Sequence, residues 1–404
     1  MAANEMSFNQ ISTVLNAIHA QATGTQVPAA VDTASFVTQA QAVLKTGYDP
    51  IMSAVSQVLS RTIFSIRPYS AKFRGMMVSP ERYGNHVRKI NISDKSWQND
   101  DRPTLTDGNS VDQQTVNVPN VVQTNFYGEN VFEKSYTIFR DQLDVAFTGP
   151  EELQRFVSLV VGNANDMLEQ SREELARALV ANYIGAKYVT TANLLEGSEG
   201  VVHLLTEYNT VTGLTGNDAL TATTVYQPAN FKPFMQWVYS RIATISALLT
   251  ERSSRFHLNM SLSGTDKTLM RHTPYERQRV YLFAPARFQS EAMVLADTFH
   301  DNYLRFADTE TVNFWQNITD PDRIIVHPNW LNPDGTIGNT NQDIDLSPVF
   351  GVIMDEETTG FTPVNQWQAP APFNARGGYT TVWMHETQRH WTDMTENGVV
   401  LLLD

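Results

Sequence analysis

The chain has 404 residues, a formal net charge of −14 at pH 7 and no cysteine. This length allows two domains or one elongated domain with extensions, and the lack of cysteine excludes disulfides, thiolate catalysis and cysteine-based metal sites. Charged residues make up only 18% of the chain, against about 25% in typical soluble domains, so we expect partners to cover much of its surface. The acidic balance argues against nonspecific binding to phosphate backbones, which requires clustered lysine and arginine.

The first 60 residues are rich in alanine, glutamine, serine and threonine and carry almost no charge. They contain three short segments of helical period, and Asp32 is placed to cap the second of them. Because none of these segments could bury enough apolar surface alone, we expect an arm that lies on another surface. A frayed terminus is the alternative interpretation of residues 1–30.

A long polar excursion, residues 91–119, interrupts the extended pattern that follows. Alternating or β-branched residues flank it at 87–92 and at 116–126, and they predict a two-stranded projection. An isolated hairpin is only marginally stable in water, and so long a loop is unusual in a compact domain. We therefore expect the projection to dock on a neighbouring molecule, with Trp97 and Leu105 as its apolar anchors.

Basic residues gather before this projection and in its first flank. Nucleic-acid contact is one interpretation, and we favour pairing with acidic surfaces on adjacent copies of this net-negative chain. The basic residues are Arg61, Arg67, Lys72, Arg74, Arg82, Arg88 and Lys89, opposed in sequence only by Glu81. The predicted contacts between subunits are Arg82, Arg88, Lys89, Trp97 and Leu105.

The clearest helical pattern runs from Pro150 to Ile184, where apolar residues recur at spacings of three and four. Pro150 suits the first helical position, and Glu151 and Glu152 complement the positive end of the helix dipole. At 1.5 Å per residue the helix would be about 50 Å long, roughly three times the ordinary length. A strut of this length is suited to stiffening a flat plate.

Helices and strands are mixed in the remainder of the chain. A short helical stretch is expected at 201–207, Asn230 is placed to cap an amphipathic helix, and Ala284-Pro285 begins another. The strands that we predict are 256–262, 278–283, 322–327, 349–354, 379–384 and 398–403.

Several spacings in the sequence suggest a catalytic or metal-binding motif, but none of them matches the motif. His385 and His390 are five residues apart, so on a helix they would diverge by about 140°, and their neighbours favour a strand. The stretch from Asp334 to Asp345 lacks the ligand and the glycine that a calcium loop needs. Asp141 and Asp144 are expected to be solvated, and no nucleophile elbow or phosphate-binding loop occurs. We therefore predict no enzyme activity, no cofactor and no metal site.

The sequence also shows no pattern typical of a signal peptide or a membrane span. The N-terminal residues lack the basic and apolar regions of a signal peptide, and the longest apolar runs fall far short of the roughly 20 residues of a membrane span. We expect a soluble chain in the cytoplasm.

The order of these elements resembles the major capsid protein of tailed bacteriophages, the Hong Kong 97-type fold that encapsulins share. Residues 1–60 resemble the N-terminal arm of that family, and 87–126 resemble its extended loop, which lies over an adjacent subunit. The helix 150–184 is similar to the spine helix. The strand–proline–helix step at 278–288 is typical of the axial domain, and 373–383 resembles the strand that returns to the peripheral domain.

The resemblance implies an α+β fold with an N-terminal arm, an extended β-hairpin loop, a long spine helix in a peripheral domain and a mixed α/β axial domain. The corresponding ranges are arm 1–62, extended loop and base 63–131, peripheral domain 132–228 with spine helix 150–184, axial domain 229–374, and returning strands 375–404.

The function that the resemblance implies is that of a structural subunit. It would self-assemble into hexamers and pentamers of an icosahedral or prolate shell that encloses double-stranded DNA without sequence-specific binding. The shell would be part of the virion and assemble in the host cytoplasm, with separate scaffolding, portal and decoration proteins. An encapsulin-like cellular compartment and an enzyme with an unrecognised site are the alternatives.

Overall fold

Two compact units divide the chain, and both are discontinuous in sequence. Unit 1 comprises 1–84, 129–175 and 362–389, and unit 2 comprises 85–128, 176–361 and 390–404. The five ranges that the resemblance implies remain a prediction, which the division into these two units does not test. The computed structural model describes residues 8–25, 30–45, 50–51, 54, 73–77, 87–93, 106–110, 114, 120–194, 199–258, 261–262, 265–266, 269–284, 308–332 and 336–404.

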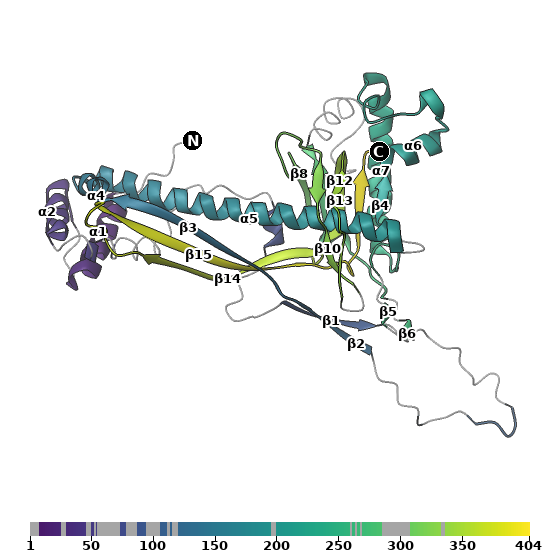
Figure 1. Cartoon of the computed structure of the whole chain (residues 1–404), viewed down its shortest axis with the longest axis horizontal. Coiled ribbons are helices and arrows are strands. Elements are labelled where there is room, and N and C mark those ends of the chain that lie inside the picture. Colours follow the sequence, from purple (N-terminus) through teal and green to yellow (C-terminus); the bar gives the residue numbers. More distant parts are fainter. Residues whose placement is uncertain are drawn as a thin grey trace. The chain divides into compact units, whose positions relative to one another are not determined.

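Unit 1 combines short helices with a three-stranded sheet of strand order β14-β15-β3, and the long helix α5 begins in it (Figure 1). The described elements are α1 (Phe8–Thr23), α2 (Thr33–Leu44), a 3₁₀ turn (Arg74–Met76), β3 (Gly128–Phe139), α4 (Arg140–Ala146), α5 (Pro150–Leu194), β14 (Thr359–Pro370) and β15 (Tyr379–Thr392). The last residues of β15, the first of β14 and the second half of α5 belong to unit 2.

Helices α1 and α2 pack into the core of unit 1. Leu15 of α1 and Phe36 of α2 are fully buried in the same cluster as Leu143 of α4 and Val157 of α5. These two helices therefore lie on another surface, as expected, and that surface is formed by α4 and α5 of their own chain. The N-terminal arm itself stays a prediction. Asp32 caps α2 as predicted: its carboxylate accepts a hydrogen bond from the Ser35 amide at 2.8 Å.

The long helix is confirmed, but it ends at Leu194 rather than at Ile184. Its final turns bury Ala186 and Val189 together with Lys187. A lysine in the apolar stripe appears in the sequence as the end of the pattern, which explains the early boundary. No helix among the described residues is both long and apolar enough to cross a membrane.

Unit 2 is organised around a five-stranded sheet of order β4-β16-β13-β7-β8. The central strand β13 is antiparallel to both of its neighbours, whereas the two outer pairs are parallel. Every residue of β13 and β16 is buried, as expected for strands covered on both faces. The strands are β4 (Val201–His203), β7 (Gln278–Phe283), β8 (Asp308–Val312), β13 (Val349–Asp355) and β16 (Gly398–Leu402).

Smaller elements complete unit 2. They are α6 (Leu204–Thr212), α7 (Pro228–Thr250), the 3₁₀ turns Gly216–Asp218 and Tyr275–Arg277, and the strands β5 (Ser261–Leu262), β6 (Thr265–Asp266), β9 (Ile324–Val326), β10 (Asn329–Leu331), β11 (Ile337–Asn339) and β12 (Ile344–Leu346). The small strands form the pairs β10-β11, β12-β9 and β5-β6.

The apolar strand runs were predicted well, and the polar strands were missed. The structure confirms the strands expected at 278–283, 349–354 and 398–403 within one residue, and it extends the one expected at 379–384 to Thr392. It corrects 256–262, where only the last two residues form a strand, and 201–207, which begins as β4 before α6. The helix expected from Ala284 lies outside the described residues, apart from Ala284 itself.

The predicted two-stranded projection is present in unit 2. Strands β1 (Val87–Ser93) and β2 (Asn120–Phe126) pair antiparallel, with Val87 opposite Phe126 and Ser93 opposite Asn120. They form a narrow ribbon of their own (Figure 1), hydrogen-bonded to none of the five strands of the main sheet.

Candidate functional site

The β1–β2 hairpin has two different faces. On one face Lys89 is opposite Thr124, and this face is largely buried, with Thr124 and Phe126 less than a tenth exposed. On the other face Arg88 and Ile90 are exposed, and Ile90 retains 56% of its accessible surface. Alternation along the strand therefore gives the hairpin an inner face, against the rest of unit 2, and an outer face in solvent.

Lys89 is the centre of an ion-pair cluster at the base of the hairpin. Its ammonium Nζ lies 2.9 Å from Oδ2 of Asp393, 2.5 Å from Oε1 of Glu396 and 3.3 Å from Oε2 of Glu357. Asp393 and Glu396 belong to the turn between β15 and β16, and Glu357 to the turn between β13 and β14. One cation thus joins three segments that are far apart in sequence.

Two carboxylates of the cluster, those of Asp393 and Glu396, also contact groups other than Lys89. Asp393 Oδ1 accepts hydrogen bonds from the amide and the hydroxyl of Thr395, at 2.8 and 2.7 Å. Glu396 Oε1 lies 3.1 Å from a guanidinium nitrogen of Arg271. The amide of Asp393 also donates to the carbonyl of Thr358 at 2.7 Å, which ties the two turns together.

Burial and charge compete at these groups. Burial by itself lowers the pKa of Lys89, but the carboxylates of Asp393 and Glu396 outweigh it and the pKa is raised. For Asp393, burial opposes ionisation, yet Lys89 and the Thr395 hydrogen bonds hold its pKa below the usual value. At Glu396 burial is the largest influence, and its pKa is raised despite Lys89 and Arg271.

Tyr183 of α5 adjoins the same cluster. Its ring is fully buried, and its hydroxyl makes no hydrogen bond with a described residue. Burial raises the pKa of Tyr183, and the carboxylates of Asp393 and Asp355 act in the same direction. A Cβ at Gly398 would overlap the Tyr183 hydroxyl oxygen, so this close approach requires glycine at the start of β16.

Lys187, one helical turn after Tyr183, has different surroundings. Its Nζ donates to the carbonyl of Phe256 at 2.6 Å, and the residue is 2% exposed. Burial lowers the pKa of Lys187 to about 7. The neighbouring His257 has its pKa lowered to about 4, mainly by burial. This region therefore favours neutral side chains.

The predicted inter-subunit residues have different outcomes. Arg82, Trp97 and Leu105 lie outside the described residues. Arg88 lies on the exposed outer face, as a contact residue would. The acidic partners expected for Lys89 on an adjacent copy are found instead in its own chain. No local pattern could have indicated them, because Lys89 and Asp393 are 304 positions apart.

The residues that suggested catalysis are brought to no common site. His385 and His390 both lie in β15, which confirms the strand, and His385 stacks on Trp367 with ring centroids 4.0 Å apart. Asp141 and Asp144 are in α4, where Asp144 lies 3.6 Å from Arg140.

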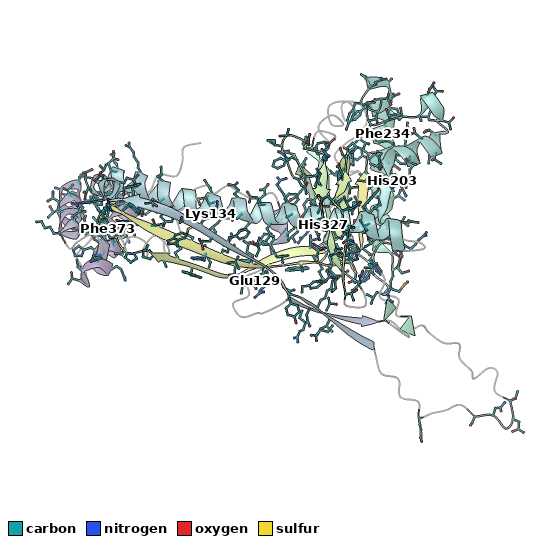
Figure 2. The ribbon with its side chains drawn as sticks, viewed as in Figure 1. Glu129, Lys134, His203, Phe234, His327 and Phe373 are labelled. Atoms are coloured by element: carbon teal, nitrogen blue, oxygen red, sulfur yellow. The ribbon has the colours of Figure 1, made fainter. Side chains whose placement is uncertain are left out.

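Isolated histidine–carboxylate pairs occur in unit 2. His203 and His327, labelled in Figure 2, each lie beside one carboxylate: that of Asp404 at 2.7 Å and that of Asp343 at 3.3 Å. Asp343 belongs to the stretch that has the length of a calcium loop. Within the described ranges no three histidine, aspartate or glutamate side chains are grouped to hold a metal ion.

Unit 1 contains an apolar groove of about 560 Å³ between β3, α4 and the start of α5. Its walls include Tyr136, Val145, Phe156 and Leu159. Val145 and Leu159 are largely exposed, and Leu159 retains 73% of its accessible surface. Such a groove is a surface on which another molecule could bury apolar area.

Comparisons with known proteins agree with this geometry. The model of the Phi29-like phage major capsid protein family matches residues 11–402. A chain in the structure of the head fiber and inner core protein gp22 of native bacteriophage P68 is similar at 12% identity, with a TM-score of 0.54, over 85% of this chain and 87% of that one. The capsid structure of Staphylococcus phage Andhra is similar at 10% identity and a TM-score of 0.53, with the same coverage of the two chains. These likenesses show the fold, and no curated protein sequence matches the chain.

Proposed function

Because this chain belongs to the Phi29-like phage major capsid protein family and is a structural subunit of a phage capsid shell, we propose that it assembles into hexamers and pentamers. The closed shell encloses packaged double-stranded DNA without reading its sequence. The outer face of the β1–β2 hairpin and the tip beyond it bear on an adjacent copy. The single observation that carries the proposal is the family match over residues 11–402.

The charge and composition of the chain support this proposal. A net charge of −14 disfavours adhesion of the wall to the phosphate backbone. A shell subunit also makes many modest contacts at once, so that the assembly is stable while each pair is weak. The low content of charged residues suits a surface that is largely covered by copies of itself.

The hairpin supplies the contact that we propose for the adjacent copy. Its inner face is occupied by the chain's own carboxylates, while Arg88 and Ile90 present a cation and an apolar side chain outward. The tip, with Trp97 and Leu105, and the basic residue Arg82 belong to the same proposed interface. The groove beside Leu159 is a second surface that we propose neighbouring copies cover.

The wider partners follow from the same proposal. Scaffolding, portal and decoration proteins are separate chains, and assembly takes place in the host cytoplasm before the subunit becomes part of the virion capsid. We propose a structural role and no catalytic one. The encapsulin-like alternative receives no support, since the matching family is one of phage major capsid proteins.

Removing the hairpin tip tests the proposal. Strand β1 ends at Ser93 and β2 begins at Asn120, so a short turn in place of 94–119 leaves both strands in register. We expect this variant to fold, by circular dichroism, and to form no closed particles in negative-stain electron microscopy. Normal polyhedral shells from the shortened chain would refute the hairpin contact.

A charge substitution provides a finer test of the same interface. Arg88→Glu reverses the charge on the outer face, and we expect it to reduce the yield of sedimentable particles. Arg88→Lys keeps the charge and serves as the matched control, with assembly close to that of the unaltered chain. Equal yields from both variants would exclude Arg88 from the interface.

A further inference from the structure

We infer that Lys89 is a positioning residue, whose ammonium pins the inner face of the hairpin to the β13–β14 and β15–β16 turns. It thereby sets the orientation of the hairpin relative to the rest of unit 2. The consequence for assembly rests on the proposed function, in which the hairpin reaches an adjacent copy. The anchoring itself is a property of the single chain.

The hairpin needs such an anchor because no backbone ladder among the described strands joins it to the rest of unit 2. β1 and β2 form a separate two-stranded sheet, and a lone pair of strands is marginally stable in water. Side chains on the inner face must therefore hold the hairpin against the rest of unit 2. Among the described residues these are Lys89, with its ion pairs, and the buried Thr124 and Phe126.

Apolar contact and ion pairing contribute differently to this anchor. Phe126 buries apolar area, which is favourable in many orientations. Lys89 must place one ammonium between the Asp393 and Glu396 carboxylates, at 2.9 and 2.5 Å. Charge-assisted hydrogen bonds of this length are directional. Lys89 is thus the group that selects one orientation of the hairpin base.

The acceptors are rigid enough for this role. Thr395 holds Asp393 through two hydrogen bonds, and Arg271 contacts the same oxygen of Glu396 that Lys89 contacts. Arg271 also donates to the Thr395 carbonyl at 3.2 Å. A preorganised acceptor loses little entropy when the lysine arrives, so the ion pairs keep more of their strength.

Burial makes the anchor specific for a cation. The Asp393 and Glu396 side chains are 4% and 8% exposed. Without Lys89 the Asp393 carboxylate would remain buried and would lose the cation that the described part of the chain places against it, which is strongly unfavourable. Opening the hairpin base would admit water to the unpaired carboxylate and so relieve this cost. Neighbouring positions thus have separate tasks: Lys89 orients the hairpin, and Arg88 faces outward for contact.

Hydrogen exchange on the full-length subunit tests the anchor, and particle formation tests its consequence. We expect Lys89→Met to speed amide exchange in β1 and β2 by about tenfold or more, since local protection follows local stability, while exchange in β13 and β16 stays unchanged. Particle yield should fall as well. Lys89→Arg keeps the cation and should restore most of the protection.

Arg88→Met is the matched control on the opposite face. It should leave amide exchange in the hairpin unchanged and lower particle yield. A purely structural defect would instead speed amide exchange in the hairpin. If Lys89→Met proves poorly folded, the variant Lys89→Met/Asp393→Asn/Glu396→Gln removes the buried charges together and takes its place.

The two measurements separate the two ideas. Unchanged hairpin exchange in Lys89→Met, or in the triple variant, overturns the anchoring role. Faster hairpin exchange with normal shells supports the anchor and overturns the proposed hairpin contact between copies. Faster exchange together with lost assembly supports both.

Discussion

Lys89 and Lys187 are both withdrawn from solvent in unit 2, yet their surroundings displace their pKa values in opposite directions. Lys89 lies among the carboxylates of Asp393, Glu396 and Glu357, and its pKa is raised. Lys187 donates to a single backbone carbonyl, and its pKa is lowered to about 7. The surroundings favour the charged form of the lysine in one region and the neutral form in the other.

The difference shows that burial alone does not decide whether a lysine stabilises the protein. A buried cation is tolerated when carboxylates and hydrogen bonds surround it, and it is costly when they do not. In the region around Lys89, we expect replacement of any single charged side chain to lower the stability of the protein. The region around Lys187 would be more stable with an apolar side chain of similar length.

The largest effect is expected from breaking the Lys89 region. Asp393→Ala leaves the ammonium of Lys89 without its most deeply buried carboxylate, and it should lower the free energy of unfolding by about 3–5 kcal/mol. Urea unfolding followed by tryptophan fluorescence measures the change. Asp343→Ala, at an exposed pair with His327, is the matched control and should have little effect. Similar midpoints for the two variants would contradict the prediction.

The next largest effect is expected at Lys187, where substitution should raise the free energy of unfolding instead of lowering it. Lys187→Met removes a group that must lose its proton or be buried as a cation, so it should raise the free energy of unfolding at pH 7 by an amount on the order of 2 kcal/mol. The gain is smaller than the pKa shift implies, because the Phe256 carbonyl loses its donor.

The pH dependence sharpens the same comparison. Between pH 7 and 10.5 the unfolded chain binds more protons at Lys187 than the folded one does, so stability should rise with pH across this window. The raised pKa of Lys89 has the opposite effect, but only above pH 10.5. Lys187→Met should flatten the rise between pH 7 and 10. Parallel curves for the two proteins would show that Lys187 is not the cause.

A smaller effect is expected where Tyr183 meets Gly398. Gly398→Ala places a methyl group against the Tyr183 hydroxyl and should destabilise the protein by about 1–2 kcal/mol. Tyr183→Phe removes a buried hydroxyl that has no partner among the described residues, so the double variant should recover part of the loss. Strict additivity of the two substitutions in thermal unfolding would argue against the contact.

The smallest effect is expected at an exposed ion pair. Arg323 contacts Asp345 at 2.6 Å, but both side chains are at least 40% exposed. Arg323→Met should therefore give no measurable change in thermal stability, because solvent screens such pairs. A loss as large as that of Asp393→Ala would mean that burial does not distinguish the two ion pairs.

Local patterns were sufficient for several elements of this chain. The three- and four-residue spacing after Pro150 predicts α5, and continuous apolar runs predict β7, β13 and β16. The polar stretch between two β-branched flanks predicts the β1–β2 hairpin. In each case neighbouring residues alone encode the period or the break, so one sequence window carries enough information.

Other features depend on contacts between distant residues. The strands β3 and β14 escaped prediction because much of their surface is polar, and α1 and α2 gave no sign that their partners are α4 and α5. Lys89 was predicted to contact an adjacent copy, and the predicted helix ended before Lys187. Their roles are set by Asp393, Glu396 and Phe256, which come near only after folding. A side chain's charge state and energy depend on the groups that surround it, and chain order does not specify those neighbours.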